Sequence, residues 1–197
     1  CIKIKVGRRS LKDDLDHLRN IRDHFPKDTT IRVDANRLWD LDQAQCFIDN
    51  AQGFNIEYLE EPTKNIGDIQ YLQGMNIALD ESLEEKSEAI LYPQVTHIII
   101  KPTLQGGKKG IDKWYSLAKQ TNRTLIFSST FESSLGIWHI GHLAASITKN
   151  CCHGLGTLRW FQTDLTNSPL LQHNNYLFLP KFPPIINFNH TKLEASG

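Results

Sequence analysis

Residues 30–36 read Thr-Ile-Arg-Val-Asp-Ala-Asn, a short β-branched run that ends in a carboxylate. This composition is typical of a buried strand. Because successive residues of a strand face opposite sides, Arg32 and Asp34 share one face, with Asp34 at its end. Working outward, we find five further runs of this kind, at residues 2–6, 55–60, 76–80, 96–101 and 124–129.

Amphipathic patterns with helical spacing separate these runs. They predict helices at residues 10–24, 41–52, 66–73, 84–91, 108–121 and 134–148. Ser10 and Asp40 stand where N-caps are expected. Strand starts lie roughly 20 to 28 residues apart, the length of a βα unit, which favours a parallel sheet with helical crossovers. We therefore expect one α/β domain over residues 1–197, either a barrel or a doubly wound sheet, with an irregular tail from about residue 161.

Composition excludes several classes of function. The 197 residues contain 22 Lys+Arg and 22 Asp+Glu, and this balance argues against a partner such as nucleic acid or an anionic membrane. No apolar run approaches the roughly 18 residues of a membrane span. The four cysteines have no metal-clip or disulfide spacing, which favours a reducing, cytoplasmic setting. The sequence opens without Met in an apolar alternation, so we expect no signal peptide and a missing upstream segment. The oligomeric state stays open.

The strand ends supply ionisable residues in the order Lys5, Asp34, Glu60, Asp80 and Lys101. A single charged residue at a strand end is most often solvated, and a doubly wound sheet also places polar residues there. A series from five successive strands is more typical of a barrel, whose chemistry is built at the C-terminal ends of its strands. The three carboxylates would form an all-oxygen site suited to Mg²⁺, and the flanking lysines could serve as bases.

These residues resemble motifs of the enolase superfamily and, within it, of the o-succinylbenzoate synthases. The shared elements are Lys3–Gly7, Arg32–Trp39, Glu60–Pro62, Ala78–Ser82, Lys101–Gly107 and Ser128–Gly136, of which the last two resemble the synthase branch in particular. The resemblance implies a modified TIM-type (β/α) barrel that is incomplete at the N-terminus, because the sequence begins at the second barrel strand without the capping domain and the first strand.

The resemblance also implies roles for individual residues. Lys5 would be the acid/base on the second barrel strand, and Lys101 its partner on the sixth. Mg²⁺ would be the cofactor, with Asp34, Glu60 and Asp80 as its ligands. The supporting residues would be Lys3, Arg32 and Asn36. The residues that hydrogen-bond the substrate would be Ser128, Ser129 and Thr130.

The implied activity is that of a lyase acting on a small-molecule carboxylate. It is the Mg²⁺-dependent syn dehydration of 2-succinyl-6-hydroxy-2,4-cyclohexadiene-1-carboxylate to o-succinylbenzoate, in menaquinone or phylloquinone biosynthesis. One alternative is an N-acylamino acid racemase or dipeptide epimerase with two opposed lysine bases. The sequence of residues 102–104, Pro-Thr-Leu, argues against this alternative. Another is a non-catalytic truncated barrel, which the complete set of lysines and carboxylates opposes.

Overall fold

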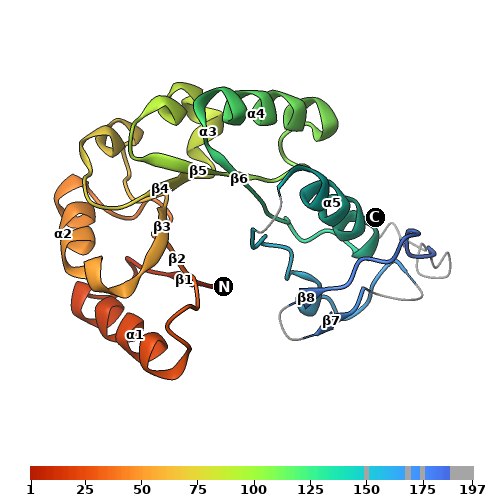
Figure 1. The fold of residues 1–197 in the computed structure, drawn as a ribbon, viewed down its shortest axis with the longest axis horizontal. Coiled ribbons are helices and arrows are strands. Elements are labelled where there is room, and N and C mark those ends of the chain that lie inside the picture. Colours follow the sequence, from red (N-terminus) through yellow and green to blue (C-terminus); the bar gives the residue numbers. More distant parts are fainter. Residues whose placement is uncertain (149–150, 167–169, 174–175, 187–197) are drawn as a thin grey trace, which may run out of the picture. The chain divides into compact units, whose positions relative to one another are not determined.

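The computed structural model describes residues 1–148, 151–166, 170–173 and 176–186. Two compact units make up the chain, one formed by Cys1–Ile99 and Ser116–Leu125, the other by Ile100–Tyr115 and Ile126–Gly197. One sheet contains six strands in sequence order (Figure 1). They are β1 (Ile2–Lys5), β2 (Ile31–Asp34), β3 (Ile56–Glu60), β4 (Ile77–Leu79), β5 (Val95–Ile100) and β6 (Thr124–Phe127).

Helices follow the strands, as the sequence predicts. The α-helices are α1 (Leu11–His24), α2 (Leu41–Ala51), α3 (Ser82–Glu85), α4 (Gly107–Thr121) and α5 (Ser134–Ile147). The 3₁₀ helices are η1 (Gln52–Phe54), η2 (Ile66–Tyr71), η3 (Ser87–Leu91) and η4 (Leu158–Trp160), and the short strands β7 (Gln172–His173) and β8 (Tyr176–Leu177) pair antiparallel. The six strands and the four longest helices are confirmed to within two residues.

Two predicted helices differ from the structure. The segment expected at 66–73 is the 3₁₀ helix η2, and the Asn65 side chain at its N-cap accepts the Gly67 N–H at 3.0 Å. The segment expected at 84–91 is interrupted at Lys86, which leaves the helical region with φ −146° and ψ 84°. In the predicted tail, the described residues from 161 onward form the short strands β7 and β8 and otherwise no helix or strand, and residues 167–169, 174–175 and 187–197 lie outside the described residues.

Parallel pairing in the first unit fixes which strand residues lie side by side. Lys5 is opposite Asp34, Asp34 is opposite Glu60, and Glu60 is opposite Ala78. Asp80 follows Ala78 by two residues and therefore continues the same face of the sheet. The register alone brings the C-terminal ends of four strands, with their charged residues, to one edge.

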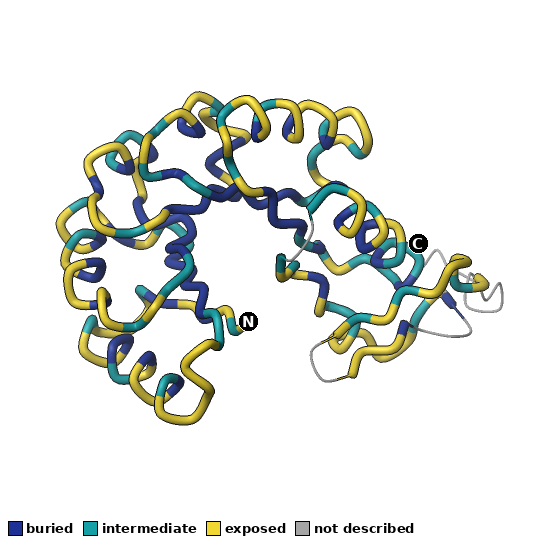
Figure 2. The backbone as a smooth tube through the Cα atoms, in the orientation of Figure 1, coloured by how far each residue is buried: buried dark blue, intermediate teal, exposed yellow. Residues whose placement is uncertain are grey.

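Burial explains why these strands form. Every residue of β2 and β4 is buried, and Figure 2 shows these strands in dark blue, whereas β1 at the edge of the sheet is mostly intermediate or exposed. Continuous burial is characteristic of parallel strands that are covered on both faces. Leu18 of α1 and Phe47 of α2 are fully buried, and each such side chain contributes about 1.5–3 kcal/mol. The core therefore forms the support on which the strand ends rest.

The loop after β1 is held close to the sheet by Gly7. This residue has a φ of 85°, and a Cβ there would lie 3.1 Å from the Trp39 ring, so glycine satisfies both conformation and space. The Gly7 N–H also donates to Asp14 Oδ2 at 2.8 Å. N-capping of α1 by Ser10 and of α2 by Asp40 is confirmed, the latter as a full capping box with Gln43.

The second unit carries α5 and the segment after it. Gly154 forms a parallel bridge to Ser128, and its carbonyl accepts the Ser129 N–H at 3.0 Å. Asp164 receives the Ser134 N–H at 3.0 Å at the start of α5. Within the described ranges, no helix combines the length and the apolar character that crossing a membrane requires.

Candidate active site

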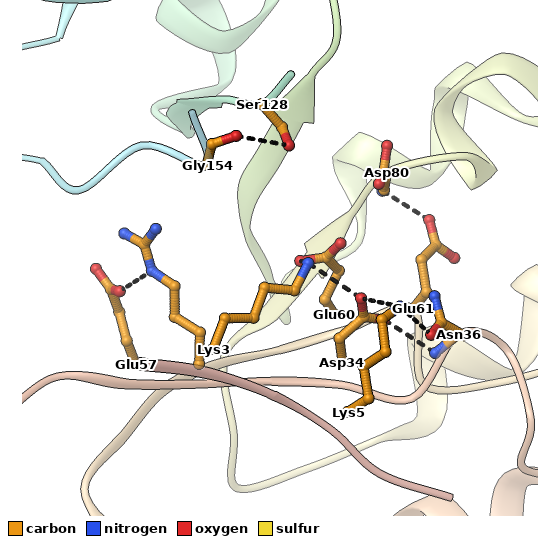
Figure 3. A network of polar contacts seen from close by, with 11 residues as sticks. Lys3, Lys5, Asp34, Asn36, Glu57, Glu60, Glu61, Asp80, Ser128 and Gly154 are labelled. Carbon is orange, nitrogen blue, oxygen red and sulfur yellow. Dashed lines mark hydrogen bonds and ion pairs between the residues drawn. The ribbon is translucent and has the colours of Figure 1, made fainter. Parts of the chain in front are cut away.

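The carboxylates at the ends of β2 and β3 are joined by a lysine from β1 (Figure 3). Lys3 Nζ lies 2.6 Å from Glu60 Oε2 and 3.0 Å from Asp34 Oδ2. Lys5 Nζ lies 3.5 Å from the same Asp34 oxygen and donates to Asn36 Oδ1 at 2.6 Å. The structure thus brings five of the predicted site residues into one network, here called the carboxylate cluster: Lys3, Lys5, Asp34, Asn36 and Glu60.

The chain leaves β2 in an unusual conformation that serves this cluster. Asn36 and Arg37 have φ values of 47° and 59°, in the left-handed region that non-glycine residues rarely adopt. Such residues cost on the order of 1–3 kcal/mol each and persist where surrounding contacts hold them. Here the Asn36 N–H donates to Asp34 Oδ1 at 3.0 Å, and the Arg37 N–H donates to the Glu61 carbonyl at 2.7 Å. The strained turn therefore orients the Asp34 carboxylate.

Asp80 joins this region through Glu61, the residue that follows Glu60. Glu61 Oε1 accepts the N–H of Asp80 at 2.6 Å and the N–H of Ser82 at 2.9 Å, while Oε2 accepts the Ser82 hydroxyl. Figure 3 shows Glu61 directed toward Asp80 from the neighbouring strand end. All three predicted metal ligands are buried, with 3%, 1% and 7% of Asp34, Glu60 and Asp80 exposed.

Burial and charge act on the protonation of this cluster. Burial raises the pKa of Glu60 to about 8, the attraction of Lys3 opposes the rise, and repulsion by Asp34 and Asp80 adds to it. For Lys3, burial lowers the pKa, but the attraction of Glu60 and Asp34 outweighs it, so the pKa is raised and the ammonium is retained. Burial also raises the pKa of Glu61 to about 7, against the hydrogen bonds from Ser82 and Asp80.

The donor set fits a hard divalent cation. Three buried carboxylates at adjacent strand ends offer only oxygen ligands, which is the chemistry that Mg²⁺ prefers. Among the residues that the structure describes, no three His, Cys, Asp or Glu side chains already converge as a metal site. Lys3 Nζ instead bridges Asp34 and Glu60 and supplies positive charge there. The Mg²⁺ assignment stays a prediction.

Arg32 lies one layer below the carboxylates, in a buried polar group. Its Nε donates to Glu57 Oε2 at 2.5 Å, and its guanidinium carbon lies 5.0 Å from the centre of the Tyr58 ring. His97 packs against Tyr58 at 4.8 Å between ring centres, and its Nε2 is 3.9 Å from Glu57 Oε1. Burial lowers the pKa of His97, and Glu57 opposes this effect. Through these contacts with Glu57 and Tyr58, Arg32 supports the strands that carry the carboxylate cluster.

Lys101 and the predicted substrate-binding hydroxyls belong to the second unit. Lys101 follows β5, and its N–H donates to Gln105 Oε1 at 3.0 Å. The Ser129 hydroxyl lies 3.0 Å from the Gly154 carbonyl and 2.9 Å from Thr157 Oγ1. The contact of the Ser128 hydroxyl with Gly154 is long, at 3.5 Å. Of these two serines, Ser128 therefore has the more weakly engaged hydroxyl.

The third predicted substrate residue, Thr130, is held by Glu132. Glu132 accepts the Thr130 hydroxyl at 2.6 Å, the Thr130 N–H at 2.6 Å, and the hydroxyl of Thr103 at 2.5 Å. Partial burial raises the pKa of Glu132, but these hydrogen bonds outweigh it and the pKa is lowered. Glu132 thus ties the loop after Lys101 to the loop after β6.

Sequence reasoning did not assign roles to Glu61 and Glu132, and it gave Lys3 only a supporting role. The signal for Glu61 was its place directly after a predicted ligand and before Pro62, where an ionisable side chain at a buried strand end requires partners. For Glu132 the signal was weaker, because an acidic residue among serines in a loop is usually solvated. Glu61 accepts hydrogen bonds from residues 80–82, and Glu132 accepts one from Thr103 in another loop; spacing along the sequence does not reveal such contacts.

Comparison with known proteins now places the chain in a family. The family described as "Enolase C-terminal domain-like" matches residues 1–183, and the chain belongs to it. Its α/β fold is a partial barrel of six parallel strands, as the sequence predicts, and it matches the C-terminal TIM-barrel domains of the enolase superfamily. Enzymes of this superfamily are typically lyases or isomerases, act on carboxylate substrates and usually use a divalent metal.

Among curated proteins, o-succinylbenzoate synthase of Enterobacter sp. is 35% identical over 170 residues, covering 83% of this chain and 53% of that protein. Among solved structures, MenC from Desulfotalea psychrophila has 28% identity and a TM-score of 0.78, covering 90% of this chain and 52% of that one. The L-Ala-D/L-Glu epimerase from Bacillus subtilis has 25% identity and a TM-score of 0.80, covering 93% and 54%. The chain therefore spans about half the length of these relatives.

Proposed function

We propose that the chain carries the active site of an o-succinylbenzoate synthase, which removes water from 2-succinyl-6-hydroxy-2,4-cyclohexadiene-1-carboxylate. The observation that carries the proposal is the position of Lys5. Its amine lies at the strand edge beside Asp34 and Asn36, in a chain that shares 35% identity with a synthase of this name. A base next to a set of carboxylates is what abstraction of a proton α to a substrate carboxylate requires.

In the proposed reaction a C–H bond and a C–O bond break on the same face of the ring, a C=C bond forms, and water leaves. Lys5 as the neutral amine takes the proton, and the resulting ammonium gives it to the departing hydroxyl. Asn36 Oδ1 accepts from Lys5 Nζ and so fixes the direction of the amine. Lys101 stabilises the ring with its charge, and the hydroxyl of Ser128 binds the succinyl end.

Asp34, Glu60 and Asp80 would hold Mg²⁺, which when bound supplies charge stabilisation for the substrate carboxylate. Lys3 must then release at least one of the two carboxylates that it bridges. The flexible stem of Lys3 would let its ammonium move aside while it stays near the cluster. Arg32 and Glu57 below the cluster keep the strand ends fixed during such a change.

The direct test is turnover of the cyclohexadiene substrate, followed by ultraviolet absorbance with Mg²⁺ and again after EDTA. The protein used should include any coding sequence that precedes these residues. We expect substrate loss that depends on metal and returns when Mg²⁺ is restored.

Parallel assays with N-acylamino acids and dipeptides address the alternative raised by the solved epimerase structure. Epimerisation without dehydration would replace the synthase proposal, and absence of both activities in a folded protein would refute an enzymatic role in either reaction.

A further inference from the structure

Glu61 is a buried carboxylate that the proposed chemistry leaves without a task. It is 0% exposed, and its partners among the described contacts come from residues 80–82. Two main-chain N–H groups converge on Oε1 and one hydroxyl on Oε2. Hydrogen bonds to an ionised acceptor are stronger than neutral ones, and an apolar side chain here would leave buried donors unpaired.

The main chain of Glu61 is equally constrained. Its φ of 44° lies in the left-handed region, and its N–H donates to the Ala78 carbonyl at 3.1 Å while its carbonyl accepts from Arg37. Residue 61 is therefore tied to the turn after β2 on one side and to the end of β4 on the other. With the main chain held in this way, the carboxylate of Glu61 is directed to the turn that begins at Asp80.

Asp80 is the one predicted ligand whose strand ends before it. β4 stops at Leu79, so Asp80 lies just past the end of the strand. By contrast, Asp34 and Glu60 are themselves paired strand residues. The N–H of Asp80 donates to Glu61 Oε1 at 2.6 Å, so the Glu61 side chain holds the peptide of Asp80 in place.

From this geometry we propose that Glu61 is a positioning residue, which fixes the peptide of Asp80 and so aims the Asp80 carboxylate at a divalent cation shared with Asp34 and Glu60. The inference rests on the metal-binding role proposed above for these three residues. Glu61 touches neither cation nor substrate in this role and acts entirely through residues 80–82.

The test compares Glu61→Ala with Glu61→Gln, in the full-length protein freed of metal with EDTA. Glutamine can accept the N–H groups of Asp80 and Ser82 through Oε1 and can donate to the Ser82 hydroxyl through Nε2, so it should rescue what alanine loses. Glu81→Ala is the matched control, because Glu81 is the same residue type, one position beyond Asp80, and is exposed. Circular dichroism establishes that each variant is folded at the temperature used.

Two measurements are made on each variant. Calorimetric titration with Mg²⁺ should show dissociation constants about 10-fold or more weaker for Glu61→Ala, and within about 3-fold of wild type for Glu61→Gln and Glu81→Ala. Amide hydrogen exchange without metal should accelerate at Asp80 and Ser82 in Glu61→Ala alone. Equal Mg²⁺ affinity in Glu61→Ala and wild type would overturn the proposal, as would unchanged exchange at Asp80.

The two measurements also separate this proposal from the one on which it rests. If the wild-type protein binds no Mg²⁺ but exchange at Asp80 responds to Glu61→Ala, Glu61 still positions the turn and the metal-site proposal fails. If Mg²⁺ binds normally and neither measurement responds to Glu61→Ala, the metal site stands and the positioning role of Glu61 is wrong.

Discussion

The carboxylate cluster of the first unit and the loop Ser128–Ser134 of the second unit both carry predicted site residues, but they hold them in different ways. In the cluster, Asp34 and Glu60 are buried strand residues whose neighbours follow from the register of the sheet. In the loop, Thr130 depends on the single carboxylate of Glu132, and Phe131 is 61% exposed with a φ of 66°. Strand register therefore fixes the first set of residues, whereas the side chain of Glu132 holds the loop beyond Ser129, so substitutions in the two regions should differ in effect.

The largest effect is expected at Lys5, the member of the cluster with a proposed chemical task. Lys5→Ala should lower kcat for dehydration by about 10²- to 10⁴-fold, the usual contribution of a general acid/base. Mg²⁺ affinity should stay near the wild-type value, because Lys5 contacts one predicted ligand at 3.5 Å. Lys12→Ala, at an exposed lysine paired with Asp16 on α1, is the control. A Lys5→Ala enzyme with a near wild-type rate would refute the acid/base role.

The next largest difference between the two regions is expected in how much a substitution lowers the free energy of unfolding. Leu59 of β3 is 0% exposed, so Leu59→Ala should lower the free energy of unfolding by about 2–5 kcal/mol. Phe131 makes an edge contact with Phe161 at 6.4 Å between ring centres and is mostly solvated, so Phe131→Ala should cost less than about 1 kcal/mol. Urea unfolding followed by circular dichroism measures both. Similar losses would show that the loop is part of a cooperative core.

The response to pH offers a finer test in the first unit. Burial lowers the pKa of His97 below its ordinary 6.5. Below pH 6.5, His97 therefore binds a proton more readily in the unfolded chain than in the folded chain. The contribution to stability is present above pH 6.5 and is lost as the pH falls, with a loss of up to about 1 kcal/mol per pH unit. Urea unfolding across this range should show the slope, and His97→Gln should flatten it.

The smallest effect is expected at Glu132, in the loop. Partial burial raises its pKa but hydrogen bonds from Thr103 and Thr130 outweigh that effect, so the folded pKa lies below the ordinary 4.5. The stability that this shift supplies is present above pH 4.5 and is lost as the pH falls through the folded pKa. Solvent screening keeps it small. A carboxyl titration by NMR should place the pKa below 4.5, and Thr103→Val should move it upward.

The same contrast explains which features of the fold and the site could be predicted from the sequence. The order of strands, the capping by Ser10 and Asp40, and the meeting of Lys5, Asp34 and Glu60 follow from periodicity and parallel register, which are local rules. Sequence patterns did not reveal that Lys3 bridges two carboxylates, because the reach of a flexible side chain depends on three-dimensional distance. Sequence patterns did not assign roles to Glu61 and Glu132 for a related reason. The Asp80 N–H that Glu61 accepts lies 19 residues away, and Glu132 accepts from Thr103, 29 residues away, as well as from nearby Thr130.

The in-order pairing of β1 to β4 has a consequence for how the protein acquires its site. Each strand pairs with the next one along the chain, so every new pairing closes a loop of one βα unit and no strand waits for a distant partner. Pairings of this limited sequence separation cost less loop-closure entropy than pairings between strands far apart in the chain, so each βα segment can add to an existing edge. On this view Lys5 and Asp34 come together when β1 and β2 have paired. The set of three carboxylates is complete only when β4 has paired with β3 and Glu61 has bound the turn at Asp80.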